Sequence, residues 1–478
     1  MARDNDIEEK SMQHPLEESS GGGTRGSLGG EPRVALDDAT HAVWYRSINR
    51  QQWSALIASN LGWFFDGYET YALVLTVGGA LGQLLPASGH AQIPFYAGLV
   101  IALTLLGWGI GGLIGGILTD YIGRKRMMMF AILAYSLTTG LSALSWDWTS
   151  FAALRFIVGL AMGSEWATGT AMTAEIWPDR HRGKGAGLMQ CGLGTGFFVA
   201  SLIWLFMSGA GEHAWRYMYL IGVLPGLATL WMRAGIPESE QWQRVNTERK
   251  ATLARRKSGV TLDAREQSLA RFTLVDLLAD AKLRRRTWIA VLMSLSTTLG
   301  WWGISTWVPP YIGSVAARAG LSAASWASFA GMAYNVGAIS GYIGLGFLAD
   351  AYGRKRITCL FFAMAFVLTP VLFMWTHDVG LLLAVACVAG FFSLGQYTWM
   401  PTWLPELYPT RVRGTAIALC FNVPRFLAWT GPLVAGTLIT RFGGYGHAAV
   451  IVGFIYLVGL ALAPWLPETR GQPLPEEV

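Results

Sequence analysis

Residues 116–126 read Gly-Ile-Leu-Thr-Asp-Tyr-Ile-Gly-Arg-Lys-Arg, and residues 346–356 repeat them as Gly-Phe-Leu-Ala-Asp-Ala-Tyr-Gly-Arg-Lys-Arg, 230 positions later. A second pattern, Glu-Ile-Trp-Pro-Asp-Arg-His-Arg-Gly at 175–183, returns as Glu-Leu-Tyr-Pro-Thr-Arg-Val-Arg-Gly at 406–414, an offset of 231. Two unrelated patterns at nearly one offset indicate an internal duplication.

A third pair supports the same duplication. Pro237-Glu238 returns as Pro467-Glu468, again 230 residues later. Three pairs in register predict two parallel repeats, with the quoted stretches as equivalent loops.

The composition is that of a membrane protein. The chain is 53% hydrophobic and only 14% charged, and its mean hydropathy is +0.38, whereas soluble domains are about 25% charged. A bilayer core needs about 20 apolar residues per helix. We therefore expect an all-α membrane protein with twelve transmembrane helices in two six-helix repeats. The helices are predicted near 53–80, 94–118, 127–145, 149–176, 184–208, 215–236, 287–316, 324–349, 357–375, 379–407, 413–440 and 446–466.

These helices divide the chain into five parts. Residues 1–50 are polar and predicted to be a disordered tail without a cleaved signal peptide. Residues 51–236 and 287–466 form the two six-helix bundles, joined by a charged, partly helical central loop at 237–286. Residues 467–478 form a C-terminal tail.

Basic residues are concentrated in alternate short loops. The intervening loops carry only Arg318 and Arg441, plus Arg216 at a helix start. Positive charge marks the cytoplasmic side, so we expect both termini and the central loop there. The net charge of +6 then reflects membrane orientation, and no nucleic-acid partner is expected. The basic loop residues are Arg124, Lys125, Arg126, Arg180, Arg182, Lys184, Arg354, Lys355, Arg356, Arg411 and Arg413.

The repeated loops resemble the signature of the major facilitator superfamily. Arg155-x-x-x-Gly159-x-x-x-Gly163 resembles its helix-four motif, and the Pro-Glu pairs resemble half-ending motifs shared with sugar porters. The resemblance implies the major facilitator fold, alternating access and a multi-pass protein of the bacterial inner (plasma) membrane. We expect a monomer whose partners are its substrate and the lipid bilayer.

The resemblance also implies that the repeated loops form a cytoplasmic gate in the outward-open state. A carboxylate at a helix end can pair with a nearby Arg and with an exposed helix N-terminus. The alternative is that the basic residues only fix membrane orientation. The predicted gate residues are Gly116, Asp120, Gly123, Arg124, Glu175, Arg182, Gly346, Asp350, Gly353, Arg354, Glu406 and Arg413.

Several charged residues fall inside predicted membrane helices, where each costs at least ~2.5 kcal/mol. Asp66 and Glu69 are three apart and share a helix face, which is expected to line the cavity. Glu165 lies near the middle of the fourth helix and Arg155 nearer its external end. Arg425 lies near the middle of the eleventh helix.

The duplication does not account for these charges. The counterpart of Glu165 is Gln396, and the counterpart of Arg425 is Gly194. An acid whose solvation changes between conformations can load and release a proton, and a fixed guanidinium can hold a carboxylate bidentately. We predict proton coupling in the first half and anion binding in the second. The alternative is that Arg425 simply pairs with Glu165 or Asp66.

Asp66-Gly67-Tyr68-Glu69 resembles the helix-one motif of the aromatic-acid and sialate/monocarboxylate proton symporters. By this resemblance Asp66 and Glu69 couple the proton, Arg155 and Glu165 assist, and Arg425 binds the substrate carboxylate. Glu69 stands where many relatives carry Asp, so the site of protonation stays open.

Further candidates lie inside predicted helices. The amides Gln190, Asn335 and Gln396 can bond to substrate or join helices. The aromatic residues Trp302 and Tyr397 can stack on a planar substrate or fill the core.

The sequence therefore predicts proton-coupled uptake of a small organic anion, a monocarboxylate or aromatic carboxylate, with protons as coupling ion and no cofactor. A sugar porter is the alternative, although a neutral sugar needs no intramembrane Arg. A transporter-like sensor would need a signalling domain. An enzyme is not expected, because no nucleophile triad, metal site or phosphate loop is found, and the four cysteines lack paired spacing.

Overall fold

The computed structural model describes the chain from Trp44, with gaps at the positions noted below. Residues 1–47 and 48–478 form separate compact units. In the first unit, Trp44–Ser47 form the short helix η1, and most of the predicted N-terminal tail lies outside the described residues. Every regular element among the described residues is a helix. The described residues are 44–207, 209–227, 231, 235–430, 438–439 and 441–476.

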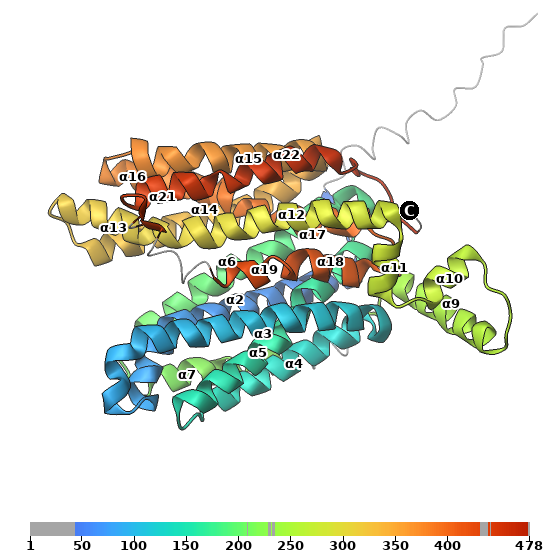
Figure 1. Cartoon of the computed structure of the whole chain (residues 1–478), viewed down its shortest axis with the longest axis horizontal. Coiled ribbons are helices and arrows are strands. Elements are labelled where there is room, and N and C mark those ends of the chain that lie inside the picture. The colour runs from blue at the N-terminus through green and yellow to red at the C-terminus, as the bar shows by residue number, and fades with distance from the viewer. Residues whose placement is uncertain are drawn as a thin grey trace, which may run out of the picture. The chain divides into compact units, whose positions relative to one another are not determined.

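The described residues of the N-terminal half form the α-helices α2 to α7 (Figure 1). Capping boxes begin two of them: Asn49 and Gln52 bond reciprocally at the start of α2, and Asp147 and Ser150 do so at the start of α5. Such caps satisfy amides that a helix leaves unbonded. The bonds from Ser150 also lower the pKa of Asp147. The helices are α2 (Arg50–Leu84), α3 (Ile93–Ile122), α4 (Arg124–Ser142), α5 (Trp148–Ile176), α6 (Arg182–Met207) and α7 (Ala214–Ile221).

The C-terminal half is more broken than the sequence predicted. The predicted continuous helix 413–440 ends at Asn422 and resumes at Arg425, because Pro424 has no N–H to continue the ladder. The predicted helix 287–316 is interrupted by the 3-10 turn Ser305–Trp307, just before Pro309. The helices are α12 (Ala281–Ile304), α13 (Val308–Arg318), α14 (Ala323–Tyr352), α15 (Arg354–Pro370), α16 (Val379–Ser393), α17 (Trp399–Leu407), α18 (Arg413–Asn422), α19 (Arg425–Ala428), α21 (Tyr445–Gly453) and α22 (Ile455–Leu462).

The central loop is partly helical, as predicted. It contains α9 (Glu240–Lys257), α10 (Ala264–Ala270) and α11 (Thr273–Ala279). Figure 1 shows these helices beyond one end of the two bundles. We call this the loop end of the bundles and the opposite one the far end.

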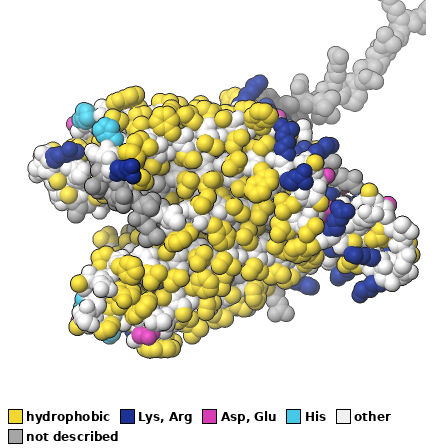
Figure 2. Space-filling model, in the orientation of Figure 1, with side chains coloured by type: hydrophobic (Ala, Val, Ile, Leu, Met, Phe, Trp, Pro, Cys, Tyr) yellow, Lys and Arg dark blue, Asp and Glu magenta, His cyan; other side chains and the backbone are white. Residues whose placement is uncertain are grey.

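Six helical stretches among the described residues are long and apolar enough to cross a membrane. Figure 2 shows hydrophobic side chains along both bundles and many Lys and Arg side chains at the loop end. The six stretches identify a membrane-type surface, while the count of twelve crossings stays a prediction. They are Ala87–Ile122, Asp179–Met207, Ser325–Tyr352, Arg354–Trp375, Val379–Leu407 and Tyr445–Trp465.

Candidate functional site

The predicted gate residues of the first repeat meet at the loop end. Arg124 donates to Asp120 Oδ1 at 3.1 Å and, with two nitrogens, to both oxygens of Glu175 at 2.9 and 3.1 Å. Arg413, at the start of α18, donates to Glu175 Oε1 at 2.7 Å. The four side chains are fully buried. This network therefore joins α3 and α5 of the first half to α18 of the second.

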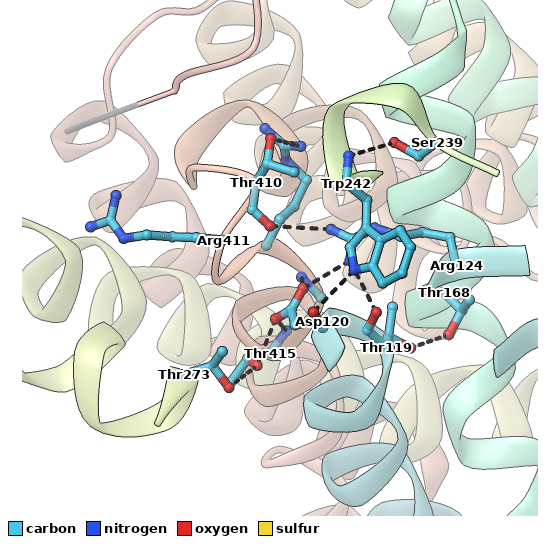
Figure 3. A network of polar contacts seen from close by, with 12 residues as sticks. Thr119, Asp120, Arg124, Thr168, Ser239, Trp242, Thr273, Thr410, Arg411 and Thr415 are labelled. Carbon is cyan, nitrogen blue, oxygen red and sulfur yellow. Dashed lines mark hydrogen bonds and ion pairs between the residues drawn. The ribbon is translucent and has the colours of Figure 1, made fainter. Parts of the chain in front are cut away.

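Asp120 also caps α18 (Figure 3). Its carboxylate accepts from the backbone N–H of Gly414 at 3.1 Å and of Thr415 at 2.9 Å, and from the Thr415 hydroxyl at 2.8 Å. A Cβ added at Gly414 would lie 2.9 Å from Asp120 Oδ1 and 3.1 Å from the Gly116 carbonyl. Small residues are therefore required where the two halves approach.

The second repeat makes the matching contacts. Asp350 accepts from Arg354 at 2.8 Å and from the N–H groups of Gly183 and Lys184, at the start of α6, at 3.0 and 2.9 Å. Arg354 donates to both oxygens of Glu406, and Arg182 donates to Glu406 Oε1 at 2.9 Å. In each half, an aspartate thus caps a helix of the other half, and a glutamate pairs with an arginine of the other half. Gly346 packs against the Gly183 backbone in this contact.

The glycines of the quoted loops turn the chain sharply. Gly123 and Gly353 have φ of 109° and 102°, a region that favours glycine. Glu238 accepts from the N–H of Arg124 at 3.0 Å, and Glu468 accepts from the N–H of Arg354 at 2.9 Å. The repeated Pro-Glu pairs therefore supply the caps of α4 and α15.

Glu468 has a shifted pKa as a result. Partial burial by itself raises the pKa of the carboxyl, but hydrogen bonds from the backbone N–H groups of Arg354, Lys355, Arg470 and Thr469 bring it below the ordinary value. The ionised form is therefore the one that caps α15.

The central loop adds contacts that the sequence did not predict. Arg249 of α9 donates to the carbonyl of Asp120 at 2.7 Å and to that of Arg411 at 2.8 Å. Trp242 also donates to the Asp120 carbonyl, at 3.0 Å (Figure 3). Burial lowers the pKa of the Arg249 guanidinium. One arginine among many in a charged loop gives no sequence signal of such a role.

Halfway along the helices, Glu69 and Arg155 form a buried ion pair. Arg155 also donates to Ser142 Oγ at 2.9 Å and lies 4.5 Å from the centre of the Tyr219 ring. The second oxygen of Glu69 has no hydrogen-bond partner among the described residues. Glu69 and Arg155 also line a cavity of about 40 Å³, which is room for a few water molecules.

Asp66 and Glu165 are fully buried, and neither oxygen of either carboxyl has a hydrogen-bond partner in the described part of the chain. The Glu165 carboxyl packs directly on Gly62 of α2, where a Cβ would overlap it. Asp66 lies close enough to Glu165, Glu69 and Arg425 for its charge to interact with theirs. Two acids buried without partners are costly when both are ionised.

Arg425 begins α19 and is held without a carboxylate. Its guanidinium lies 3.8 Å from the centre of the Phe421 ring and 4.9 Å from that of Trp108, and it donates to the Phe421 carbonyl at 2.7 Å. It forms no ion pair with Asp66, Glu165 or any other acid that the structure describes. The pairing alternative is therefore not realised in this conformation.

An aromatic stack connects Arg425 to the first half. Phe421 stacks on Trp166 with ring centres 3.6 Å apart. Trp166 donates to Gln190 Oε1 at 3.1 Å, which leaves the Gln190 Nε2 without a partner among described residues. Gln396 donates to the Ser393 carbonyl and is fully buried. These two amides lie in packed interior.

The other three predicted substrate residues gather elsewhere, around an aromatic cavity. Its volume open to water-sized molecules is about 310 Å³, and Trp302 and Asn335 line it. Trp301 lines it too and packs edge-on to Tyr397, with ring centres 5.4 Å apart. Tyr71 and Phe197 of the first half complete the aromatic wall. The cavity therefore lies between the halves.

Tyr135 is a residue that sequence reasoning missed. Its side chain is buried, and its hydroxyl has no hydrogen-bond partner among the described residues. It lies within electrostatic range of Asp66, Glu165 and Glu69. A single Tyr in an apolar helix gives no signal, because only folding places it beside three acids of other helices.

Comparison with known proteins identifies the family and the fold. The family model described as "Sugar (and other) transporter" matches residues 55–477. The sialic acid transporter NanX of Escherichia coli is 28% identical over 441 residues, 91% of this chain and 98% of that protein. The cis,cis-muconate transport protein of Acinetobacter baylyi is 29% identical over 79% of this chain and 86% of that protein.

Among solved structures, the proton:xylose symporter XylE of E. coli, a major facilitator protein, shares the fold. The sugar-bound XylE chain has a TM-score of 0.70 and 23% identity, covering 89% of this chain and 98% of that chain.

Proposed function

Because this chain belongs to the family of sugar and other transporters, within the major facilitator superfamily, we propose that it is a proton-coupled symporter for a small organic anion. The expected superfamily is thus confirmed, and the chain is a transporter rather than an enzyme. The proposed mechanism is uptake across the bacterial inner membrane by alternating access.

The proposed architecture is a monomer with twelve transmembrane helices in two repeats, 51–236 and 287–466. The matching contacts of Asp120 and Asp350 support the duplication. The basic loop end is assigned to the cytoplasm by the positive-inside rule, which places both termini and the central loop there. The paired gate residues then close the cytoplasmic side, and the described conformation faces outward.

The observation that carries the proposal is Arg425, a buried cation with no acid partner among the described residues, together with Asp66 and Glu165, which have no hydrogen-bond partner in the same part of the chain. The carboxylate of a substrate can bind the Arg425 guanidinium by two parallel hydrogen bonds. Asp66 and Glu165 avoid the cost of buried charge if they carry protons in this conformation. Glu69 and Arg155 hold the neighbouring helices and assist the transfer.

The substrate is proposed to be a monocarboxylate or aromatic carboxylate. Its carboxylate is proposed to bind Arg425, and its planar body to lie in the aromatic cavity against Trp302 and Asn335. Tyr397 supports this wall through Trp301, whereas Gln190 and Gln396 do not line the cavity in this conformation. The sialic acid and muconate relatives carry acids, which supports this class. A proton is the only coupling ion required, and no cofactor is proposed.

A sugar remains the second candidate, because the family description and the XylE fold favour it. A neutral sugar gives Arg425 no partner for its charge. Uptake of radiolabelled cis,cis-muconate, benzoate and xylose into proteoliposomes tests the two. We expect an inward proton gradient to drive carboxylate uptake and a protonophore to abolish it. Gradient-driven xylose uptake that survives Arg425→Gln would overturn the anion proposal.

A further inference from the structure

A second cavity lies at the far end of the C-terminal half. The volume open to water-sized molecules is about 550 Å³, and its walls come from the end of α13, the segment before α16 and the turn before α21. Figure 2 shows basic and His side chains gathered at this end, near the helices labelled α13 and α21 in Figure 1. Its polar lining residues are Tyr311, Ser314, Arg318, His377 and Tyr445.

Two nitrogen-bearing side chains converge on this space. Arg318 and His377 line both the main cavity and an adjoining one of about 310 Å³. Arg318 is exposed and forms no ion pair with any acid in the described part of the chain. Its guanidinium keeps its charge at all relevant pH values. Within the described part of the chain, the cavity therefore carries a fixed positive charge and no acidic side chain in its lining.

The nearby acid is already engaged. Asp378 follows His377, and its carboxylate caps α16 by accepting from the Leu381 N–H at 2.7 Å. Among the described residues that line the cavity, none is an Asp or Glu. An oxyanion entering here meets donors rather than a competing carboxylate.

The opposite wall is the turn at 443–446. Gly443 and Gly444 have φ of 77° and 122°, and a Cβ at either would meet nothing within 4 Å. The Gly444 N–H donates to the Ile439 carbonyl at 2.8 Å, so this turn gives the cavity an open, uncharged wall rather than a set of free donors. Tyr311 is fixed by its hydrogen bond to the Phe373 carbonyl at 2.9 Å, which holds the wall in place.

Membrane orientation does not explain Arg318, since basic residues are disfavoured on this side in the proposed topology. We propose that this cavity is a second anion site, which binds a carboxylate or phosphate group by Arg318 and His377 against the wall formed by 443–446. Its location outside the cell rests on the proposed function, but the binding chemistry does not. A soluble anion and a phospholipid headgroup share this chemistry.

Hydrogen–deuterium exchange of the full-length protein in phosphatidylcholine nanodiscs tests the site. Sodium benzoate, and separately sodium phosphate, is titrated at constant ionic strength while exchange is followed in 311–318 and 443–447. We expect saturable slowing in both segments. Arg318→Gln should raise the apparent Kd at least about tenfold, the loss of one charged hydrogen-bond donor.

Arg441→Gln is the matched control, because Arg441 is an exposed basic residue of the same half that does not line the cavity. It should change the Kd less than about threefold. Equal weakening in the two variants, or no slowing with either anion, would overturn the site.

Nanodiscs that contain phosphatidylglycerol distinguish a phospholipid headgroup from a soluble anion as the occupant of the site. A headgroup occupant slows exchange without added anion in the unaltered protein but not in Arg318→Gln. If only the soluble probes act, the occupant is a soluble anion. Arg425→Gln should leave the slowing intact, so that failure of the transport proposal and failure of this site are distinguishable.

Discussion

The gate charges at the loop end are buried in ion pairs, whereas halfway along the helices Glu69 and Arg155 pair but three other buried charges do not pair with any described residue. At the loop end, Arg124 and Arg354 each pair with two acids, and each network receives an arginine from the other half. At mid-helix, Asp66, Glu165 and Arg425 are buried to a similar degree but form no ion pair in the described residues.

The difference separates residues that fix the two halves together from residues that are proposed to bind a substrate or a proton. A buried pair with complete hydrogen bonds is costly to break and fixes one arrangement of the halves. An unpaired buried charge gives no such benefit. In the proposed function, a ligand or a proton completes it transiently. Four predictions test this contrast.

The largest effect is expected at Arg425. Lys keeps the charge but loses the bidentate fork, so Arg425→Lys should raise the KM for carboxylate uptake about 10- to 100-fold, equivalent to ~1.4–2.7 kcal/mol. Initial rates in proteoliposomes measure it. The matched control is Arg216→Lys, at the start of α7, which should change KM little. An unaltered KM in Arg425→Lys would remove the anion role.

Substitution of Glu165 should give the next largest effect. It should impair the coupling of uptake to the proton gradient rather than substrate binding. Gln mimics the protonated acid, so Glu165→Gln should lower accumulation driven by a proton gradient about tenfold or more, while substrate exchange at equal pH continues. Paired gradient-driven and counterflow assays separate these. Asp66→Asn should behave alike if both acids share the proton; normal accumulation in both variants would place the coupling elsewhere.

The sequence predicted much of this contrast and missed its details. The repeat offset placed Asp120 and Glu175 at positions equivalent to Asp350 and Glu406, and the resemblance implied that these residues form a gate, which stays a prediction. The sequence could not show that Asp120 and Asp350 cap helices of the opposite half, because the contacting residues are 294 and 167 positions apart. Arg249 and Tyr135 were missed because nothing local distinguishes them from other Arg and Tyr residues.

The fold shows a similar division. Long apolar stretches predicted the positions of α2 to α6 well, because hydrophobic length determines a membrane helix. The breaks near Ser305 and Pro424 were not predicted, although prolines mark both places. A proline in a membrane helix can kink or end it, depending on which neighbours satisfy the freed carbonyls.

The gate should respond less than the mid-helix charges. Asp120→Asn removes one charge from the network but keeps one acceptor oxygen, so we expect about a tenfold slower transport cycle as the outward-facing state loses stability. Asp350→Asn should have a smaller effect, since only the Asp120 carboxylate also accepts a hydrogen bond from a side-chain hydroxyl, that of Thr415. Spin-label distances across the loop end, measured with uptake, test the order. Unchanged rate and distances in both variants would leave these residues with an orienting role only.

The smallest expected effect is at Glu468, and its pH dependence has a definite sign. Hydrogen bonds hold the pKa of this carboxyl below its ordinary value, so the ionised form stabilises the folded state and the contribution is lost as pH falls through the folded-state pKa. Glu468→Gln should lower the melting temperature by a few degrees at pH 7, and the difference from the unaltered protein should shrink toward pH 4. Thermal unfolding in nanodiscs across this range measures both. A difference that stays constant with pH would mean that Glu468 acts by packing and not by capping α15 with its charge. The stability of the paired loop end would then depend less on electrostatics than the role of the unpaired charges at mid-helix does.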